Sequence, residues 1–301
     1  MFIVNCELVI VRYGEIGLKA KATRRRFENV LVSNIKNALE AENVSNQIKL
    51  KRGRIFVYTE RIDKSIFALK KVMGITSVSP AIKTDSKIES MQKLAVDISK
   101  KEIKETDSFA LRVNREGNHK YTSQDVAVSV GEEVRKVTKA KVNLSKPDFT
   151  IFIEIRDDDA YFYKEKIPGV GGLPIGTQGN ALSFIDSDKS ILASWYMLHR
   201  GCKIVFMTEN KNFNKNIEEF TKKWYASSPI FFFSKDEKFF ENINKKAIDN
   251  KCEAVVTGHN IEDMYEIKLF KEKIKIPVLH PLVAMDKKQI ENKSKEIGLQ
   301  K

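Results

Sequence analysis

Hydrophobic and polar positions alternate along the first part of the chain in a way that predicts strands and helices in turn. Residues 3–12 alternate over a short apolar stretch and predict a strand. Within 22–41 an apolar residue recurs at every fourth position, from Phe27 to Leu39, which is typical of an amphipathic helix. Residues 54–59 then predict a second strand, so that the segment reads as a β-α-β unit.

The same patterns continue through the middle of the chain. They predict helices at 63–73, 87–104 and 123–138, and strands at 75–82 and 109–115. The run from 148 to 166 reads as two more strands around an acidic turn. This alternation indicates a compact α/β unit.

A stretch rich in glycine and proline, 167–180, interrupts the periodic pattern and predicts a junction between domains. Beyond it the chain alternates again, and this regular β-α-β-α repetition favours a parallel, doubly wound sheet. The predicted strands are 181–185, 202–208, 229–234 and 253–258, and the predicted helices are 189–200, 214–225 and 236–250. The overall fold class is therefore α/β.

Charge narrows the choice of partner. The 301 residues hold 53 Lys and Arg against 40 Asp and Glu, a formal net charge of +13. Such an excess attracts polyanions and favours a nucleic acid, the alternative being a solvated lysine-rich surface without a ligand. No apolar run approaches the roughly 20 residues that span a bilayer, and the N-terminus reaches charged residues too early for a signal peptide. We therefore expect no membrane partner.

Three widely spaced cysteines, Cys6, Cys202 and Cys252, form no CxxC pair. Few, widely spaced cysteines predict a protein of the reducing cytoplasm whose thiols are buried and structural.

Two basic clusters are candidates for RNA contact. Cations at a helix N-terminus are electrostatically unfavourable, so basic residues there suggest a phosphate ligand, although a solvated helix end is the alternative. The second cluster follows a strand into a basic loop, where two cations and a ring are expected on one surface. The candidates are Lys19, Lys21, Arg24, Arg25 and Arg26 in the first cluster, and Arg112, Arg115, Lys120 and Tyr121 in the second.

Several segments resemble one known family, the tRNA 4-thiouridine synthetases (tRNA sulfurtransferases). They are VRYGEIGLKAKATRRRFE at 11–28, GITSVSPA at 74–81, KPDFTIFIEIRDDDAYFY at 146–163, GVGGLPIGTQG at 169–179, AVVTG at 254–258 and VLHPLVAMDKKQIENKSKEIG at 278–298. The resemblance covers essentially the whole chain. It implies an N-terminal ferredoxin-like α+β domain and an α/β THUMP domain that capture tRNA, followed by a Rossmann-like PP-loop domain that activates a uridine with ATP for sulfur transfer. The domain bounds expected are 1–62, 63–166, a linker at 167–180, and 181–301.

The expected nucleotide loop departs from the family pattern, Ser-Gly-Gly-x-Asp-Ser. Its glycines would let backbone N–H groups approach phosphate at a helix N-terminus. The matching stretch here lacks both glycines and carries carboxylates that would repel a triphosphate. The residues of this degenerate nucleotide site are Asp186, Ser187, Asp188, Lys189, Ser190, Gly258 and His259. ATP and Mg²⁺ are cofactors only if the altered loop still binds nucleotide.

The family also places a catalytic cysteine downstream of the segment that ends here at Gly298, and this sequence runs to Lys301. We therefore expect no catalytic residue in this chain. Two hypotheses remain open. The first is a tRNA-binding protein, accessory to thiolation, whose partners include tRNA and another thiolation protein. The second is an active sulfurtransferase that takes its sulfur carrier from another chain. The sequence also leaves a homodimer open.

Other polar and aromatic groups favour structural roles. His119, His199, His259 and His280 lack metal-ligand spacing, and no metal site is expected. The acidic run 157–159 reads as a solvated turn and the aromatic run 231–233 as core.

Overall fold

The computed structural model describes residues 6–51, 53–233 and 238–299. The chain divides into two compact units. The first unit contains the N-terminal strand, Leu39–Lys70 and Thr76–Gly169. The second contains Gly14–Ala38, Lys71–Ile75 and the chain from Val170 onward.

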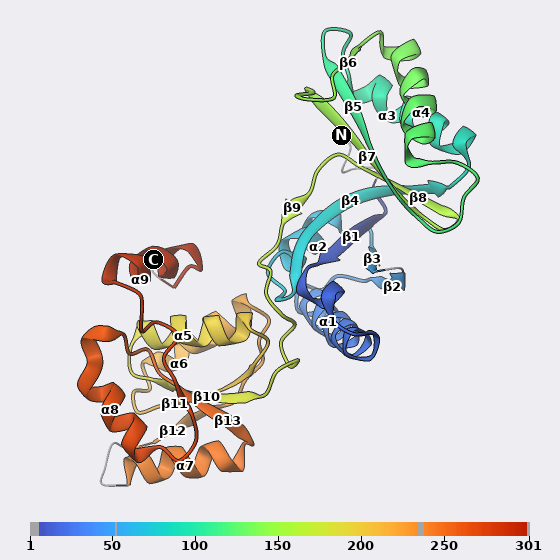
Figure 1. The fold of residues 1–301 in the computed structure, drawn as a ribbon. Helices are drawn as coiled ribbons and strands as arrows, with labels where there is room; N and C mark the ends of the chain where they lie inside the picture. The colour runs from blue at the N-terminus through green and yellow to red at the C-terminus, as the bar shows by residue number, and fades with distance from the viewer. Residues whose placement is uncertain (1–5, 52, 234–237, 300–301) are drawn as a thin grey trace. The chain divides into compact units, whose positions relative to one another are not determined.

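One large sheet forms the framework of the first unit (Figure 1). Its strand order is β2-β3-β1-β4-β8-β7-β5-β6, and β9 pairs with β4 beside this path. The strands are β1 (Leu8–Tyr13), β2 (Gln47–Lys51), β3 (Arg54–Tyr58), β4 (Ile75–Asp85), β5 (Ser108–Glu116), β6 (Lys141–Val142), β7 (Phe149–Arg156), β8 (Asp159–Tyr163) and β9 (Ile167–Pro168). The eleven-residue strand β4 lies between strands β2, β3 and β1 on one side and strands β8, β7, β5 and β6 on the other, so both groups belong to one sheet.

The predicted β-α-β unit at the N-terminus is wrong. β3 runs antiparallel to β1, with Leu8 opposite Tyr58. A further strand, β2, follows the first helix along the chain and pairs with β3. Sequence reasoning missed β2 because its residues are exposed or half-buried and rich in lysine, so it shows little hydrophobic pattern.

Helices α2 (Ile62–Leu69), α3 (Ile88–Glu102) and α4 (Ser123–Thr138) belong to the first unit. α3 and α4 pack against each other, and α4 packs against β5 (Figure 1). Buried Val126, Val130 and Val134 recur every fourth residue on α4, and Thr122 caps this helix with Asp125 in a capping box. The helix expected at 123–138 is confirmed.

An aromatic cluster joins the two groups of strands on the other side of the sheet. The rings of Phe56 on β3 and Tyr161 on β8 stack with centroids 4.4 Å apart. Leu8, Ile10 and Ala81 are buried in the same cluster. Because strand side chains alternate, these residues and their in-register neighbours form a shared inner face.

The second unit begins with the 3-10 helix Glu15–Leu18 and most of helix α1 (Lys21–Ala41). The apolar stripe from Phe27 to Leu39 is buried, which confirms the expected amphipathic helix. Asn34 donates a hydrogen bond to the carbonyl oxygen of Ile175 at 3.1 Å.

A five-stranded parallel sheet follows, in the order β12-β11-β10-β13-β14. Its strands are β10 (Asn180–Ile185), β11 (Lys203–Thr208), β12 (Ile230–Phe232), β13 (Cys252–Val256) and β14 (Val278–Leu279). Its helices are α5 (Asp188–His199), α6 (Phe213–Lys223), α7 (Phe239–Asp249), α8 (Met264–Lys273) and α9 (Lys287–Glu296). The doubly wound sheet expected from the sequence is confirmed.

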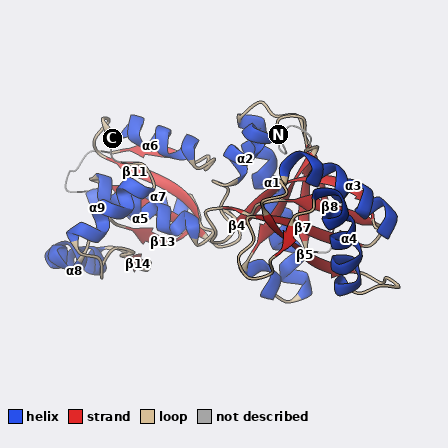
Figure 2. Cartoon of the chain, turned by 90° about the horizontal axis from the view of Figure 1, so that it is seen from above, coloured by secondary structure: helices blue, strands red, loops and turns tan. Residues whose placement is uncertain are grey.

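Helices cover both faces of this sheet (Figure 2). Apolar residues of α5, α6 and α9 pack with one face in a cluster that includes Trp195 and Phe206. Apolar residues of α7 and α8 pack with the other face, around Phe184 and Phe270. The aromatic run 231–233 is core only in part, because Phe232 points away from this cluster and is 46% exposed.

Candidate functional site

The second unit places its degenerate loop where parallel sheets bind ligands. Strand order reverses between β10 and β13, and ligands of open α/β sheets bind beyond the carboxyl ends of the strands at such a switch point. Asp186 directly follows β10, and Thr257, Gly258 and His259 follow β13. The fold therefore brings together the two segments of the degenerate nucleotide site.

Asp186 is the centre of this site. Its Oδ1 accepts hydrogen bonds from the hydroxyls of Ser190 at 2.5 Å and Ser187 at 2.9 Å. Its Oδ2 lies 3.7 Å from Nε2 of His259. Because Ser187 is the N-cap residue of α5, a fixed carboxylate stands at the positive end of this helix.

The ionised form of Asp186 is the favoured one. Partial burial raises the pKa of this carboxyl, but the nearby imidazole of His259 and the hydrogen bonds from Ser190 and Ser187 lower it by more, so the net pKa is below the ordinary value. About a third of the side chain, 33%, is exposed. The charge is therefore both stabilised by its hydrogen bonds and open to an approaching anion.

Lys189 is held by a partner of its own. Its Nζ lies 2.9 Å from Oδ2 of Asp263, and that same oxygen accepts the backbone N–H of Asn260 at 2.9 Å. Burial raises the pKa of Asp263, and the bonds from Asn260 and Lys189 lower it to below its ordinary value. The lysine charge that a phosphate would need is thus neutralised by a carboxylate.

Gly258 is required for close packing at this point. A Cβ there would stand 2.6 Å from the backbone nitrogen of Ser190 and 2.8 Å from the carbonyl carbon of Lys189. Next to it, Nδ1 of His259 and Oδ1 of Asn260 are buried without a hydrogen-bond partner among the described residues. Orphaned polar atoms of this kind often mark a functional site.

A cavity beside the loop is lined mainly by charged and polar residues. It has a volume of about 390 Å³, and its polar lining carries more carboxylates than ammonium groups. The lining residues are Asp188, Lys189, Asn260, Glu262, Lys287, Ile290, Glu291 and Ser294. Together with the carboxylate of Asp186, these groups place several negative charges around the loop.

The first basic cluster lies at the start of α1. Arg24, Arg25 and Arg26 are exposed, as is Lys21, while Lys19 is half-buried. Arg24 donates back to the carbonyl oxygen of Gly17 at 2.5 Å. That bond offsets part of the unfavourable helix-end charge, so the electrostatic argument for a phosphate ligand is weaker than the sequence suggested.

The second cluster does not form a single surface, and that expectation is wrong. Arg112 and Arg115 are three residues apart on β5 and lie on opposite faces of the sheet. Arg112 donates to the carbonyl oxygen of Leu144 and lines an apolar groove of about 590 Å³ between β5 and α4.

Arg115 lies near the end of β5 and contacts the loop that follows this strand. Its Nη1 lies 3.2 Å from Nδ1 of His119, whose ring contacts that of Tyr121 with centroids 5.2 Å apart. Tyr121 donates its hydroxyl to the carbonyl oxygen of Ser86, and Lys120 is exposed. Because an arginine only donates, Nδ1 of His119 must accept and its Nε2 donates to the carbonyl oxygen of Asp157.

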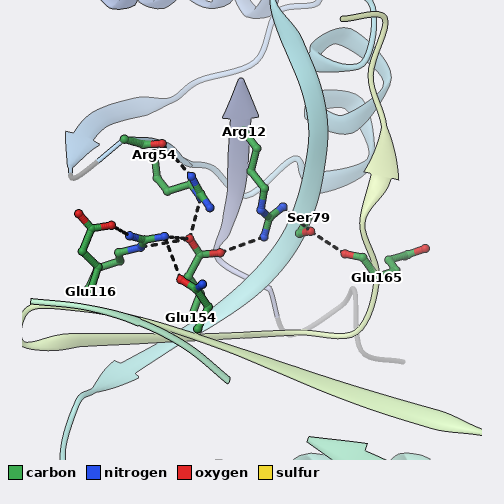
Figure 3. Close-up of polar contacts among 9 residues, drawn as sticks. Arg12, Arg54, Ser79, Glu116, Glu154 and Glu165 are labelled. Carbon is green, nitrogen blue, oxygen red and sulfur yellow. Dashed lines mark hydrogen bonds and ion pairs between the residues drawn. The ribbon is translucent and has the colours of Figure 1, made fainter. Parts of the chain in front are cut away.

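A charged cluster that sequence reasoning missed lies on the inner face of the large sheet (Figure 3). The carboxylate of Glu154 on β7 is surrounded by the guanidinium groups of Arg12, Arg54 and Arg156. The sequence signal that could have predicted this cluster is the presence of charged residues inside the apolar runs of β1 and β7, because a buried charge requires a partner of opposite charge.

The acidic turn between β7 and β8 is paired and not simply solvated. Oxygens of Asp159 lie 3.2 Å from Nζ of Lys51 and 2.9 Å from Nζ of Lys83. Burial raises the pKa of Asp159, and the bonds from both lysines lower it to below its ordinary value.

The three thiols are buried, in agreement with a packing role. Burial raises the pKa of Cys6 to about 12 and that of Cys252 to about 11, and it also raises the pKa of Cys202. A nucleophilic thiol requires the opposite shift. His199 and His280 bond to Val170 and Thr257, which fits structural roles.

Within the described part of the chain, no helix is long and apolar enough to cross a membrane.

Three protein-family models match the chain. They are described as "ThiI ferredoxin-like domain" at residues 8–79, "THUMP domain" at 85–165, and "Thiamine biosynthesis protein (ThiI)" at 211–301. The matches follow the order of domains that the sequence segments implied.

Curated relatives match nearly the whole chain. A protein of Methanobrevibacter smithii named "Probable tRNA sulfurtransferase" is 32% identical, over 98% of this chain and 87% of its own length. A protein of Methanocaldococcus jannaschii with the same name is also 32% identical, over 96% of this chain and 87% of its own.

Two solved structures share the fold. PH1313 from Pyrococcus horikoshii matches with a TM-score of 0.83 and 30% identity, over 97% of this chain and 99% of that one. The structure of a 4-thiouridine synthetase–RNA complex with bound ATP matches with a TM-score of 0.82 and 24% identity, over 98% and 85%. At that identity the second likeness concerns the fold alone.

Proposed function

Because the chain belongs to the tRNA sulfurtransferase family, we propose that it is a tRNA-binding protein whose PP-loop domain is impaired for ATP-dependent activation of uridine. In this proposal it takes part in tRNA thiolation in the cytoplasm as an accessory, beside another thiolation protein. The domain bounds 1–62, 63–166, 167–180 and 181–301 form part of the same proposal.

One observation carries the proposal, namely the carboxylate of Asp186 at the N-terminus of α5. The family pattern has glycine-rich backbone at this point, which leaves room and positive potential for phosphate. Here the hydroxyls of Ser187 and Ser190 are turned toward Asp186, and Lys189 is paired with Asp263. A triphosphate would have to displace these contacts and face several carboxylates.

The RNA-binding half of the proposal rests on charge and on the THUMP match. The chain carries a net charge of +13, and exposed cations lie at the start of α1 and in the loop after β5. Contacts to phosphates and to the shape of a folded RNA need such groups. The 4-thiouridine synthetase of similar fold is itself in complex with RNA, which agrees with a tRNA ligand for this chain.

The alternative is an active sulfurtransferase that makes 4-thiouridine with ATP. Full-length similarity to relatives named as probable tRNA sulfurtransferases favours it. With its three thiols buried, such an enzyme would take sulfur from a carrier on another protein.

Equilibrium binding of two ligands to one preparation tests the proposal. We expect unmodified tRNA transcript to bind with a strong dependence on salt, and magnesium-ATP to bind weakly or not at all. Tight ATP binding by the wild-type chain would support the alternative. Absence of tRNA binding would remove the proposal altogether.

A further inference from the structure

The charged cluster on the inner face of the first unit holds more positive than negative groups. Arg12, Arg54 and Arg156 contribute three guanidinium groups, and Glu154 and Glu116 contribute two carboxylates. The cluster therefore keeps one uncompensated positive charge, in a place where desolvation makes electrostatic interactions strong.

Glu154 is the fixed anion of the cluster. Its side chain is 2% exposed, and its oxygens lie 3.2 Å from Nη2 of Arg12 and 2.7 Å from Nε of Arg54. Arg156 donates to it from Nε at 3.1 Å and from Nη2 at 2.7 Å. Burial raises the pKa of Glu154, but the charges of Arg54, Arg12 and Arg156 lower it by more, so the net pKa is below its ordinary value.

Neighbouring groups fix the rest of the framework. Nη1 of Arg12 donates to the hydroxyl of Ser79 at 2.9 Å, and that hydroxyl donates to the carbonyl oxygen of Glu165 at 2.6 Å (Figure 3). Tyr163 stacks against the guanidinium of Arg12 at 4.7 Å. Arg156 also lies within hydrogen-bond distance of Oδ1 of Asn114 at 3.3 Å.

Glu116 differs from the other members of the cluster. It accepts a hydrogen bond from Nη1 of Arg156, yet its side chain is 51% exposed while that of Arg156 is 3% exposed. Its backbone is held by pairing with Arg156 and by the N–H of Asp157. The side chain is therefore free to rotate into solvent without disturbing the strand, and such a rotation would open Nη1 of Arg156.

We propose that Nη1 of Arg156 is a phosphate-binding position that Glu116 occupies until an RNA phosphate displaces its carboxylate. The inference rests on the proposed binding of tRNA and names one position in it. A phosphodiester carries one negative charge and accepts from guanidinium as a carboxylate does, so it replaces Glu116 with matching chemistry. Arg54, with 25% of its side chain exposed and its Nε 2.7 Å from Glu154, adds positive potential to the cluster.

Replacing Glu116 tests the proposal, because glutamine removes the competing charge but keeps an acceptor for Arg156. We expect Glu116→Gln to bind unmodified tRNA transcript about two- to fivefold more tightly. The slope of log K against log salt should steepen by about 0.7 to 0.9, the contribution of one further phosphate. Glu116→Ala should give an equal or larger gain, and thermal melting verifies that each variant is folded.

Asp158→Asn is the matched control, since it removes one exposed carboxylate from the nearby turn between β7 and β8. We expect it to leave the salt slope unchanged. An equal gain and an equal slope in both variants, or no gain in Glu116→Gln, would overturn the inference while leaving tRNA binding intact. A wild-type chain that binds no tRNA would instead remove the proposed function, and this inference with it.

Discussion

The carboxylate of Asp186 and the hydroxyl of Ser190 are hydrogen-bonded at 2.5 Å across the first turn of α5. Ser190 is fully buried, whereas Asp186 keeps a third of its side chain exposed at the end of β10. This contact places a fixed negative charge at the site where related proteins are expected to bind phosphate. That charge should govern how the loop responds to nucleotide.

Restoring the family loop should restore nucleotide binding if the loop alone is at fault. Replacing 186–190 with Ser-Gly-Gly-x-Asp-Ser removes the Asp186 carboxylate and returns backbone N–H groups to the helix end. We expect the affinity for magnesium-ATP, measured by titration calorimetry, to rise about tenfold or more.

The replacement leaves the net charge of the loop unchanged, since 186–190 carries two Asp and one Lys and the family pattern carries one Asp. Asp249→Asn, at the far end of α7, removes one carboxylate elsewhere in the second unit and is the control for that loss alone. It should leave ATP affinity unchanged. If the rebuilt loop also shows no gain, the segment after Gly258 becomes the obstacle, through the carboxylates of Glu262 and Asp263.

Gly258→Ala should destabilise the second unit. The added Cβ would lie 2.6 to 2.8 Å from backbone atoms of Lys189 and Ser190. The backbone at the start of a packed helix cannot shift to relieve this clash without a loss of stability. We expect a loss of about 1 to 3 kcal/mol in the free energy of unfolding, measured by urea denaturation. Gly17→Ala is the control, because a Cβ there meets nothing within 4 Å; equal stability of the two variants would contradict the close packing.

The basic start of α1 should contribute to tRNA binding. Replacing Arg24, Arg25 and Arg26 together with alanine should weaken binding of tRNA transcript. The salt dependence should also flatten, by about 0.7 to 0.9 for every phosphate that these arginines neutralise. An unchanged slope would remove this cluster from the binding surface.

A variant with the same change in charge separates direct phosphate binding from net charge. Lys100 and Lys101 lie exposed in the last turn of α3, and Lys104 lies exposed just after it. Their joint replacement by alanine removes three cations elsewhere. We expect a smaller loss of affinity and an unchanged slope. Equal slopes in the two triple variants would show that only the overall field matters.

Stability should fall as the pH drops below neutral, in part through His280. Burial lowers the pKa of this imidazole below 6.5, and the nearby His259 lowers it further. The unfolded chain then takes up a proton near pH 6.5 that the folded chain does not, so stability is complete above this pH and declines below it. In His280→Gln the melting temperature should fall less between pH 7 and pH 5.5; identical slopes would contradict this assignment.

The sequence predicted well the elements with strong periodicity. The helix at 123–138 and the parallel strands around β10 needed only an apolar repeat and clear breaks. It missed β2, whose stability comes from pairing with β3 and not from its own pattern. It also proposed no element beyond 258, where α8 and α9 are short and mostly polar.

Sequence reasoning could predict only those site residues that directly follow a predicted strand. A motif comparison found Asp186 and His259 because each follows a strand, and parallel topology then brought them together. The cluster around Glu154 joins residues from β1, β3 and β7 that are far apart in sequence, so their meeting depends on the register of one large sheet. The error on Arg112 and Arg115 had a simpler cause, since a spacing of three on a strand selects opposite faces.

Pyrophosphate release from magnesium-ATP, measured with and without unmodified tRNA, tests the central claim most directly. The rebuilt-loop variant serves as the comparison, and tRNA binding is measured in the same preparation. We expect the wild-type chain to bind tRNA and release no pyrophosphate in either case. Release that depends on tRNA would contradict this account and would identify the chain as an active, ATP-dependent member of its family.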